Sequence, residues 1–194
     1  MKNTGLGSRC SWAEHESMQD YHDNVWGVPV HDDKTLFEFL TLEGAQAGLS
    51  WATILKRQRT YKKAFADWNV EKIAKFTRKD FDRLMQDKGI IRNRLKIEST
   101  IRNARVFLKV QEEFGSFDRY LWNFVDHKPV INRFRSLKEI PAKTAISDTL
   151  SKNLKKRGFA FCGSTICYAL MQATGMVNDH EVTCPRWKQV QQTT

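Results

Sequence analysis

Residues 42–51 read Leu-Glu-Gly-Ala-Gln-Ala-Gly-Leu-Ser-Trp, and the only charged side chain in this run is Glu43. Burying a carboxylate is costly unless a cation or a hydrogen-bond donor meets it. Glu43 is therefore either a solvated helix residue or a residue that recognises a ligand. Most acids in such surroundings are solvated, so the choice between the two depends on the rest of the chain.

Helical periodicity dominates the segments on both sides of this stretch. Asp32 or Asp33 can cap a helix that leads into residue 42, and Ile54 and Leu55 continue the pattern after Trp51. Further helices are predicted over 61–68, from an Asn69 cap to 76, from a capping box at Thr77–Asp80 through 85, from 95 to a Gly115 cap, over 117–125, over 148–157 with Ser147 as cap, and over 164–174. Since no run alternates over more than a few residues, we predict an all-α protein.

Length and charge narrow the class of protein. A chain of 194 residues can bury about 70% of its unfolded surface, and we treat residues 1–194 as a single domain. The net charge is +10 and the sequence pI is near 9.6. Such a charge favours anionic partners, nucleic acid before a membrane surface.

No segment predicts export or membrane insertion. The first nine residues lack the apolar core of a signal peptide. Residues 158–177 carry no charge, but glycines and polar residues dilute the stretch, and we expect a buried helix there. We therefore expect a cytoplasmic protein, by default a monomer, whose four cysteines are reduced thiols or metal ligands.

Cysteine and histidine occur in pairs near the two ends of the chain. Cys10 and His22 lie near one end; His180 and Cys184, one helical turn apart, lie near the other. Two Cys and two His could complete a tetrahedral structural zinc site that joins the termini. The alternative is two surface histidines and two buried cysteines. Cys162 and Cys167 lie in the uncharged stretch and are predicted to be core thiols.

Aromatic side chains crowd the first quarter of the chain. Trp12, Tyr21, Trp26 and Trp51 accompany phenylalanines in this region. Aromatic residues usually form core, but beside basic charge they can also be stacking platforms for bases.

A tight turn centred on Gly89 joins two predicted helices at Asp87–Arg92. In a helix-hairpin-helix, such a turn points backbone amides at a phosphate, and glycine permits close approach of the backbone. Arg92, Arg94 and Lys96 would add electrostatic attraction to DNA. The alternative is an ordinary helix–turn–helix connection.

Several blocks of sequence resemble the family of 3-methyladenine DNA glycosylase I. They are Tyr21-His-Asp-Asn-Val-Trp-Gly-Val28, residues 42–55, Gly89-Ile-Ile-Arg92, and Phe161-Cys-Gly-Ser-Thr-Ile-Cys-Tyr168 through Val177-Asn-Asp-His180. The resemblance covers roughly residues 9–184 in the right order. Where relatives often have Tyr and Glu, this chain has Met18 and Val25, and Met18 can soften one wall of the pocket.

The resemblance implies an all-helical helix-hairpin-helix DNA glycosylase fold, whose helical lobes would flank a base pocket. It implies one structural zinc per chain, joining the termini through Cys10, His22, His180 and Cys184. It places the base-contacting carboxylate at Glu43, the stacking aromatics at Tyr21 and Trp51, further pocket aromatics at Trp12 and Trp26, and the DNA-binding hairpin at Gly89, Ile90, Ile91 and Arg92. The implied substrate is double-stranded DNA containing alkylated bases, and the implied product is 3-methyladenine.

This substrate gives Glu43 a physical role. Methylation at N3 places positive charge on adenine, which a buried carboxylate can meet and aromatic rings can stabilise by roughly 0.5–2 kcal/mol per contact. The base must be flipped out of the duplex, which costs a few kcal/mol. The resemblance supplies neither a catalytic Asp after the hairpin nor a Lys amine, so we predict a monofunctional hydrolase that leaves an abasic site. Glu43 would act mainly by binding and electrostatics, and whether it also activates water stays open.

Two other functions fit parts of the sequence. A non-catalytic, zinc-containing DNA-binding module would explain the charge and the hairpin, but not Glu43 among aromatics. A glycosylase of the same superfamily with a different lesion preference would explain both.

Overall fold

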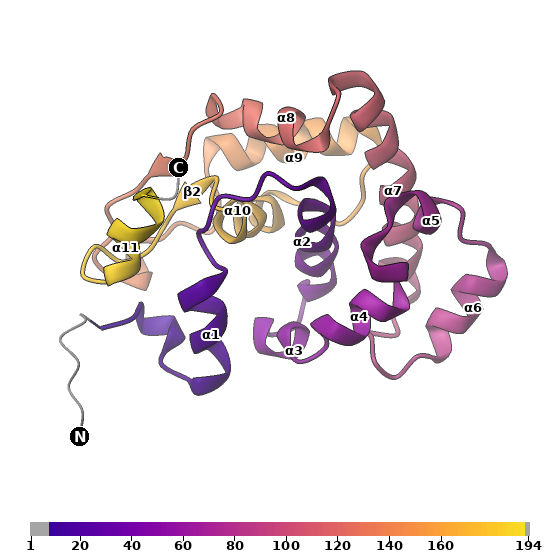
Figure 1. Cartoon of the computed structure of the whole chain (residues 1–194), viewed down its shortest axis with the longest axis horizontal. Helices are drawn as coiled ribbons and strands as arrows, with labels where there is room; N and C mark the ends of the chain where they lie inside the picture. The colour runs from indigo at the N-terminus through magenta and orange to yellow at the C-terminus, as the bar shows by residue number, and fades with distance from the viewer. Residues whose placement is uncertain (1–7, 193–194) are drawn as a thin grey trace.

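The computed structural model describes residues 8–192 as helices joined by short turns (Figure 1). The α-helices are α1 Glu16–Asn24, α2 Asp33–Gln46, α3 Trp51–Leu55, α4 Gln58–Ala64, α5 Val70–Ala74, α6 Arg78–Gln86, α7 Arg94–Phe114, α8 Phe117–Trp122, α9 Ala145–Arg157, α10 Ser164–Ala173 and α11 Pro185–Gln189. Short 3-10 helices cover Ser11–Ala13, Ala66–Trp68, Asn123–Val125, Leu137–Glu139 and Val190–Gln192. The prediction of a helical protein is confirmed.

The prediction missed one pair of strands. β1 Val130–Ile131 and β2 Val177–Asn178 pair in parallel, with Val130 opposite Val177. Two residues are too few for the alternating pattern of a strand to show in a sequence. The pair brings the segment before α9 next to the segment after α10.

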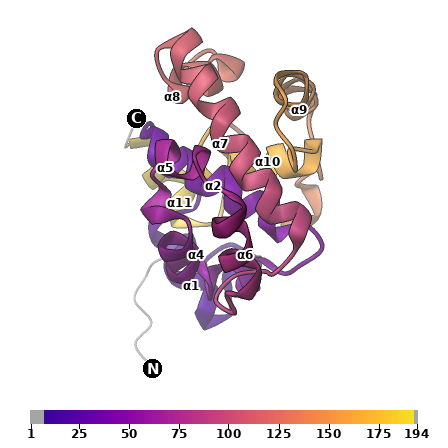
Figure 2. The ribbon, with the colours of Figure 1, turned by 90° about the vertical axis from the view of Figure 1, so that its right-hand side faces the viewer.

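Helix α2 lies in the middle of the molecule and packs against α7, α8 and α10 (Figure 1). The long helix α7 packs beside α2 and runs across the front of the view turned by 90° (Figure 2). Helices α4 to α6 lie at one end, and α1 and α11, near the two chain ends, lie at the other. Aromatic rings fill the space between α2, α7 and α8, with Phe107 stacked on Phe117 at 4.1 Å between ring centroids.

The burial of α2 decides the question that Glu43 raises. Every residue from Phe39 to Ala45 is buried, so this helix has no solvated face near its end. The side chains of a helix that is buried on all sides are not exposed to solvent. Glu43 therefore cannot be the solvated acid of the simpler interpretation.

Several helix ends follow the predicted caps. The Asp32 carboxylate accepts a hydrogen bond from the Thr35 amide at 2.8 Å, and Thr77 and Asp80 form the expected capping box. Gly115 ends α7 in the left-handed conformation, with φ of 85°. Each of these contacts satisfies a backbone group that the helix itself leaves unpaired.

Two predicted helix boundaries were wrong. The Ser147 cap is wrong because Thr144 caps α9 three residues earlier, and Ser147 is its reciprocal partner. The helix predicted over 61–68 stops at Ala64, since residues 66–68 have left-handed φ angles. The helix predicted over 164–174 is confirmed as α10, and within residues 8–192 no helix is long and apolar enough to cross a membrane.

Candidate active site and metal centre

A cavity of about 480 Å³ opens between α1, the end of α2, α3, α10 and the segment 137–142. It is lined by Trp12, Met18, Tyr21, Trp26, Glu43, Gln46, Trp51, Leu137, Ile140, Pro141, Ala142, Thr165, Tyr168, Ala169 and Gln172. A cavity of this size, mostly apolar with a few polar groups, is typical of a small-molecule site. All five predicted pocket residues line it.

Glu43 is the ionisable group at the end of α2 in this cavity, and its side chain is 4% exposed. Within residues 8–192 its carboxyl group has no hydrogen-bond or ion-pair partner. Burial therefore raises the pKa of Glu43 from 4.5 to about 8. Burial thus favours the protonated acid over the carboxylate, and a cation beside it would favour the carboxylate.

The aromatic residues surround this acid. Tyr21 and Trp51 lie with ring centroids 5.4 Å apart, and Trp12 meets Trp26 edge-on at 4.9 Å. Tyr21 and Trp26 are each 8% exposed, so their rings face the cavity and the core rather than solvent. Burial, and then the charge of Glu43, raise the pKa of Tyr21, which keeps its hydroxyl neutral.

The turn between α2 and α3 places Trp51 beside the end of α2. Helix α2 stops at Gln46, and Gly48 has a left-handed φ of 77°. The Ser50 hydroxyl accepts a hydrogen bond from the Thr53 amide and so caps α3, whose first residue is Trp51. Only glycine adopts such a φ without strain. Gly48 therefore allows the change of chain direction that places Trp51 at the cavity.

The two departures from relatives differ in position. Met18 lines the cavity, as the family resemblance predicted. Val25 lines a separate hollow behind Tyr21, between α1, α3 and α4, rather than the cavity. Its effect on a bound base would be indirect.

Sequence reasoning missed the wall that α10 contributes. Thr165, Tyr168, Ala169 and Gln172 line the cavity at the helical spacing i, i+3, i+4 and i+7. That spacing marks one face of a helix and could have revealed them. Our prediction treated this stretch only as a buried helix.

A buried carboxylate holds two of these wall residues in place. Asp179 is 1% exposed; its Oδ2 accepts hydrogen bonds from the Tyr168 hydroxyl and, at 2.8 Å, from Gln172 Nε2. Its Oδ1 accepts a third, from Asn132 Nδ2 at 2.6 Å. Satisfied buried networks of this kind fix side chains in one orientation. Asp179 follows β2, so the strand pair supports the cavity wall.

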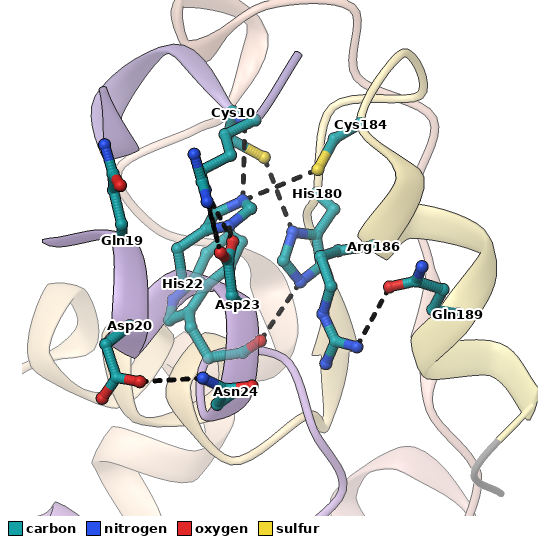
Figure 3. A network of polar contacts seen from close by, with 12 residues as sticks. Cys10, Gln19, Asp20, His22, Asp23, Asn24, His180, Cys184, Arg186 and Gln189 are labelled. Carbon is teal, nitrogen blue, oxygen red and sulfur yellow. Dashed lines mark hydrogen bonds and ion pairs between the residues drawn. The ribbon is translucent and has the colours of Figure 1, made fainter. Parts of the chain in front are cut away.

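The four predicted metal ligands come together next to Trp26, one of the residues that line the cavity. Cys10, His22, His180 and Cys184 are buried, and their donor atoms all lie within 4.8 Å of one another. Figure 3 shows Cys10 and His22, from the N-terminal segment, facing His180 and Cys184 from the C-terminal segment. The alternative of two surface histidines is wrong, since both histidines are fully buried.

The donor spacing fits a tetrahedral zinc site. Zn–S and Zn–N bonds of about 2.3 and 2.0–2.1 Å give a sulfur-to-nitrogen edge of about 3.6 Å in a tetrahedron. Cys10 Sγ lies 3.5 Å from His180 Nδ1, and Cys184 Sγ lies 3.6 Å from His22 Nε2. Two thiols and two imidazoles at these distances match what zinc requires.

The outer ring nitrogens are held by neighbouring groups. His22 Nδ1 lies 2.8 Å from Asp23 Oδ1, and His180 Nε2 lies 3.1 Å from the carbonyl oxygen of Trp26. Arg9 pairs with Asp23 and, with His22, lowers the pKa of that carboxyl to about 2. Such outer contacts orient histidine ligands in metal sites.

One detail of the predicted ligand arrangement was wrong. His180 and Cys184 are not on a helix: His180 follows β2, a turn covers residues 182–183, and Cys184 is the N-cap of α11. The turn brings both donors to the same point without a helix.

A hydrogen bond between the two sulfurs raises the pKa of Cys10 and lowers that of Cys184. Cys162 and Cys167 are buried core thiols, as predicted.

The predicted hairpin between α6 and α7 is present, but it uses several of its own polar groups. The Gly89 amide donates to Asp87 Oδ1 at 2.7 Å, and the Ile91 amide donates to the Tyr61 hydroxyl at 3.1 Å. A Cβ on Gly89 would lie 2.9 Å from Thr60 Cβ. Close packing within the protein thus already requires this glycine. Ile90 is buried and Arg92 is exposed, and DNA binding by residues 89–92 stays a prediction.

A family model described as methyladenine glycosylase matches residues 12–187. The chain belongs to the methyladenine glycosylase family. The match contains all the pocket residues, the hairpin, and three of the four clustered Cys and His residues. The family resemblance drawn from the sequence is therefore confirmed.

Individual relatives agree with this assignment. The chain is 47% identical over 181 residues to the DNA-3-methyladenine glycosylase of Haemophilus influenzae, covering 93% of this chain and 98% of that one. It is 49% identical over 177 residues to DNA-3-methyladenine glycosylase 1 of Escherichia coli, covering 91% and 95%.

Solved structures show the same fold. A crystal structure of 3-methyladenine DNA glycosylase I superposes with a TM-score of 0.88 at 48% identity, covering 92% of this chain and 98% of that one. The Staphylococcus aureus enzyme, described in a study of 3-methyladenine recognition, superposes with a TM-score of 0.89 at 37% identity, covering 93% and 97%. The similarity extends over nearly the whole length of each chain.

Proposed function

We propose that this chain is a monofunctional DNA glycosylase that hydrolyses the N-glycosidic bond of 3-methyladenine in alkylated double-stranded DNA. The observation that carries the proposal is Glu43, a buried carboxyl that has no hydrogen-bond or ion-pair partner among residues 8–192, in a cavity lined by aromatic rings. The names of the relatives support it, since two are DNA-3-methyladenine glycosylases. A further neighbour is described in complex with 3-methyladenine.

The pocket would select the base by its charge. N3-methylated adenine in DNA carries a positive charge that adenine lacks. Beside that charge Glu43 would lose its proton, and the resulting carboxylate would form an ion pair with the cationic base. Tyr21 and Trp51 would stack on the flipped base and add cation–π attraction. An undamaged adenine would leave Glu43 either protonated or as an unpaired buried charge.

The lesion itself activates the bond that breaks. As the bond from C1′ of the sugar to the base breaks, its electron pair moves to the base, which leaves as neutral 3-methyladenine. Water adds to C1′, loses a proton and leaves an abasic site. Enzymes accelerate such a step only through contacts that strengthen toward the transition state. We assign Glu43 to recognition and orientation, and the aromatic cavity to holding the base out of the stack.

We further propose that one zinc ion per chain binds Cys10, His22, His180 and Cys184 and has a structural role. All four donors are protein side chains, which leaves no open position for a substrate, as in structural zinc sites. The ion would join the segment before α1 to the segment after β2, and so hold Trp12 and Trp26 against the cavity. The DNA-binding role of residues 89–92, as in helix-hairpin-helix proteins, belongs to the same proposal.

Incubating the protein with methylated duplex DNA and identifying the released bases by mass spectrometry tests the proposed function. We expect free 3-methyladenine. Release of a different base would favour a glycosylase with another lesion preference. DNA binding without release of any base would favour a non-catalytic zinc-containing DNA-binding module.

A further inference from the structure

Lys96 lies in the first turn of α7, directly after the hairpin, and its ammonium group points into the protein. Lys96 Nζ lies 2.7 Å from the carbonyl oxygen of Ala45 and 2.7 Å from that of Ala47. Both carbonyls belong to the end of α2, where a helix leaves its last carbonyl groups without partners. Lys96, which we predicted to attract DNA, therefore binds the end of the helix that carries Glu43.

This position is electrostatically unfavourable for lysine in its own helix. The N-terminal end of a helix carries partial positive charge, so a cation in the first turn of α7 is repelled by it. Partial burial also disfavours the ammonium and lowers the pKa of Lys96. The two carbonyls at the negative end of α2 offset these costs. The local pattern of α7 alone would not favour lysine here.

The contact joins the hairpin to both main pocket residues. Glu43 is in the last turn of α2, and residues 47–50 lead from Ala47 to Trp51 at the start of α3. Lys96 holds the carbonyls on both sides of Gln46, at the point where the chain leaves α2. A shift of this point would move Glu43 and Trp51 relative to each other and to the hairpin.

A second contact from α7 holds the segment that packs on Gly44, the residue after Glu43. Asn103, seven residues after Lys96, bonds to both the amide and the carbonyl of Ala160, at 2.8 and 3.0 Å. The next residue, Phe161, has a left-handed φ of 54° and packs so closely on Gly44 that an added Cβ there would lie 3.2 Å from Phe161 Cβ. Non-glycine residues hold such a φ only where their surroundings enforce it.

We propose that Lys96 is a positioning residue that fixes the end of α2, and with it Glu43 and Trp51, relative to the hairpin. It would act through Ala45 and Ala47 rather than by touching the base or the reacting bond. The inference rests on the proposed glycosylase function. It goes beyond that function by assigning to a hairpin lysine a role in the geometry of the pocket.

The test compares K96M, K96R and K109M with the wild-type protein. Lys109 lies on the exposed side of the same helix, so K109M makes the same chemical change away from the contact. Single-turnover release of 3-methyladenine from methylated duplex is measured with enzyme in excess, and affinity for undamaged duplex is measured by fluorescence anisotropy at several salt concentrations. Circular dichroism and thermal unfolding check that each variant is folded.

We expect K96M to release the base about 10- to 100-fold more slowly, since a displacement of about 1 Å at a reacting group can cost a factor of 100. The affinity of K96M for undamaged duplex should change by less than about threefold, which is below the tenfold change that a free-energy difference of about 1.4 kcal/mol would produce. K96R should recover most of the rate, because a guanidinium can donate to two carbonyls. K109M should match the wild type.

Three results would overturn the proposal. K96M could release the base at the wild-type rate. K96M could lose only duplex affinity, with a salt dependence reduced by about one phosphate contact, which would make Lys96 a DNA ligand. A folded K96R could release the base about 10- to 100-fold more slowly than the wild type, which would remove the bridging role whether or not K96M folds. If the wild-type protein itself releases no 3-methyladenine, the proposed function fails instead.

Discussion

Replacing Glu43 with glutamine removes the charge of the pocket and leaves its shape almost unchanged. The pKa of Glu43 is about 8 rather than 4.5, so ionising it in the empty pocket costs on the order of 5 kcal/mol more than in water. At pH 7, one unit below this pKa, the remaining cost is only about 1.4 kcal/mol. A cationic base that gains a buried carboxylate as its partner can readily supply that energy.

The loss in the variant follows from the same pair of charges. Removing one partner of a buried ion pair typically costs about 3–5 kcal/mol, because the other charge is left uncompensated. We therefore expect E43Q to lower kcat/KM for release of 3-methyladenine by about 10²- to 10³-fold, the lower part of that range, since the amide still accepts a hydrogen bond. Affinity for undamaged duplex should change by less than about threefold, because such a duplex places no cation at this carboxyl.

The assay measures base release from methylated duplex under single-turnover conditions, together with anisotropy on undamaged duplex. E71Q is the matched control, since Glu71 is exposed on α5 and away from the cavity. The reasoning would be refuted if E43Q kept wild-type activity. It would also be refuted if excision and undamaged-duplex binding fell together, because Glu43 would then support the fold or the DNA surface rather than the base.

Three further predictions concern pH, metal and the hairpin. Glu43 ionises near pH 4.5 in the unfolded chain and near pH 8 in the folded chain, so the stability it contributes in its protonated form below pH 4.5 is lost as pH rises to 8. Chemical denaturation should therefore show E43Q gaining stability relative to the wild type between pH 5 and 8. A difference in stability that stays constant with pH would contradict the raised pKa. Elemental analysis should find about one zinc per chain in the wild type, C184S should lose the zinc, and D23N should bind it about 10- to 100-fold more weakly. Equal zinc content and affinity in the wild type and both variants would place the metal elsewhere. G89A should unfold more easily by about 1–3 kcal/mol, because its methyl group would overlap Thr60 at 2.9 Å; an unchanged denaturation midpoint would show that the hairpin can relax.

The sequence predicts helices well where caps and apolar stripes coincide. Asp32, the Thr77–Asp80 box and Gly115 each mark a true helix end because the cap is a local contact, made within a few residues. The break after Ala64 could not be predicted, since residues 61, 65 and 68 keep an apolar spacing through three left-handed residues. There, packing of the side chains overrides the local pattern.

The candidate site could be predicted in part for a similar reason. Tyr21, Trp51 and Glu43 stand out by residue type, and matched family motifs identify them before any geometry is known. Asp179 does not stand out, because its role depends on Tyr168 and Gln172 meeting it across a turn. The inward direction of Lys96 is equally a tertiary property, since its partners are backbone carbonyls about fifty residues away.

The proposed metal site between the two chain ends could be predicted by residue type but not by geometry. Residue types suggest a metal site, but the spacing of Cys10 and His22 from His180 and Cys184 gives no geometry. The structure supplies it through α1 on one side and the turn after β2 on the other.

The most direct test of the central claim is the ratio of free 3-methyladenine to abasic sites in methylated duplex treated with the protein, read by mass spectrometry and by an aldehyde-reactive probe. A monofunctional glycosylase should give one free base per abasic site, with the strands still intact before alkaline treatment, and E43Q should lower both together. Binding to the duplex without any free 3-methyladenine would contradict the account.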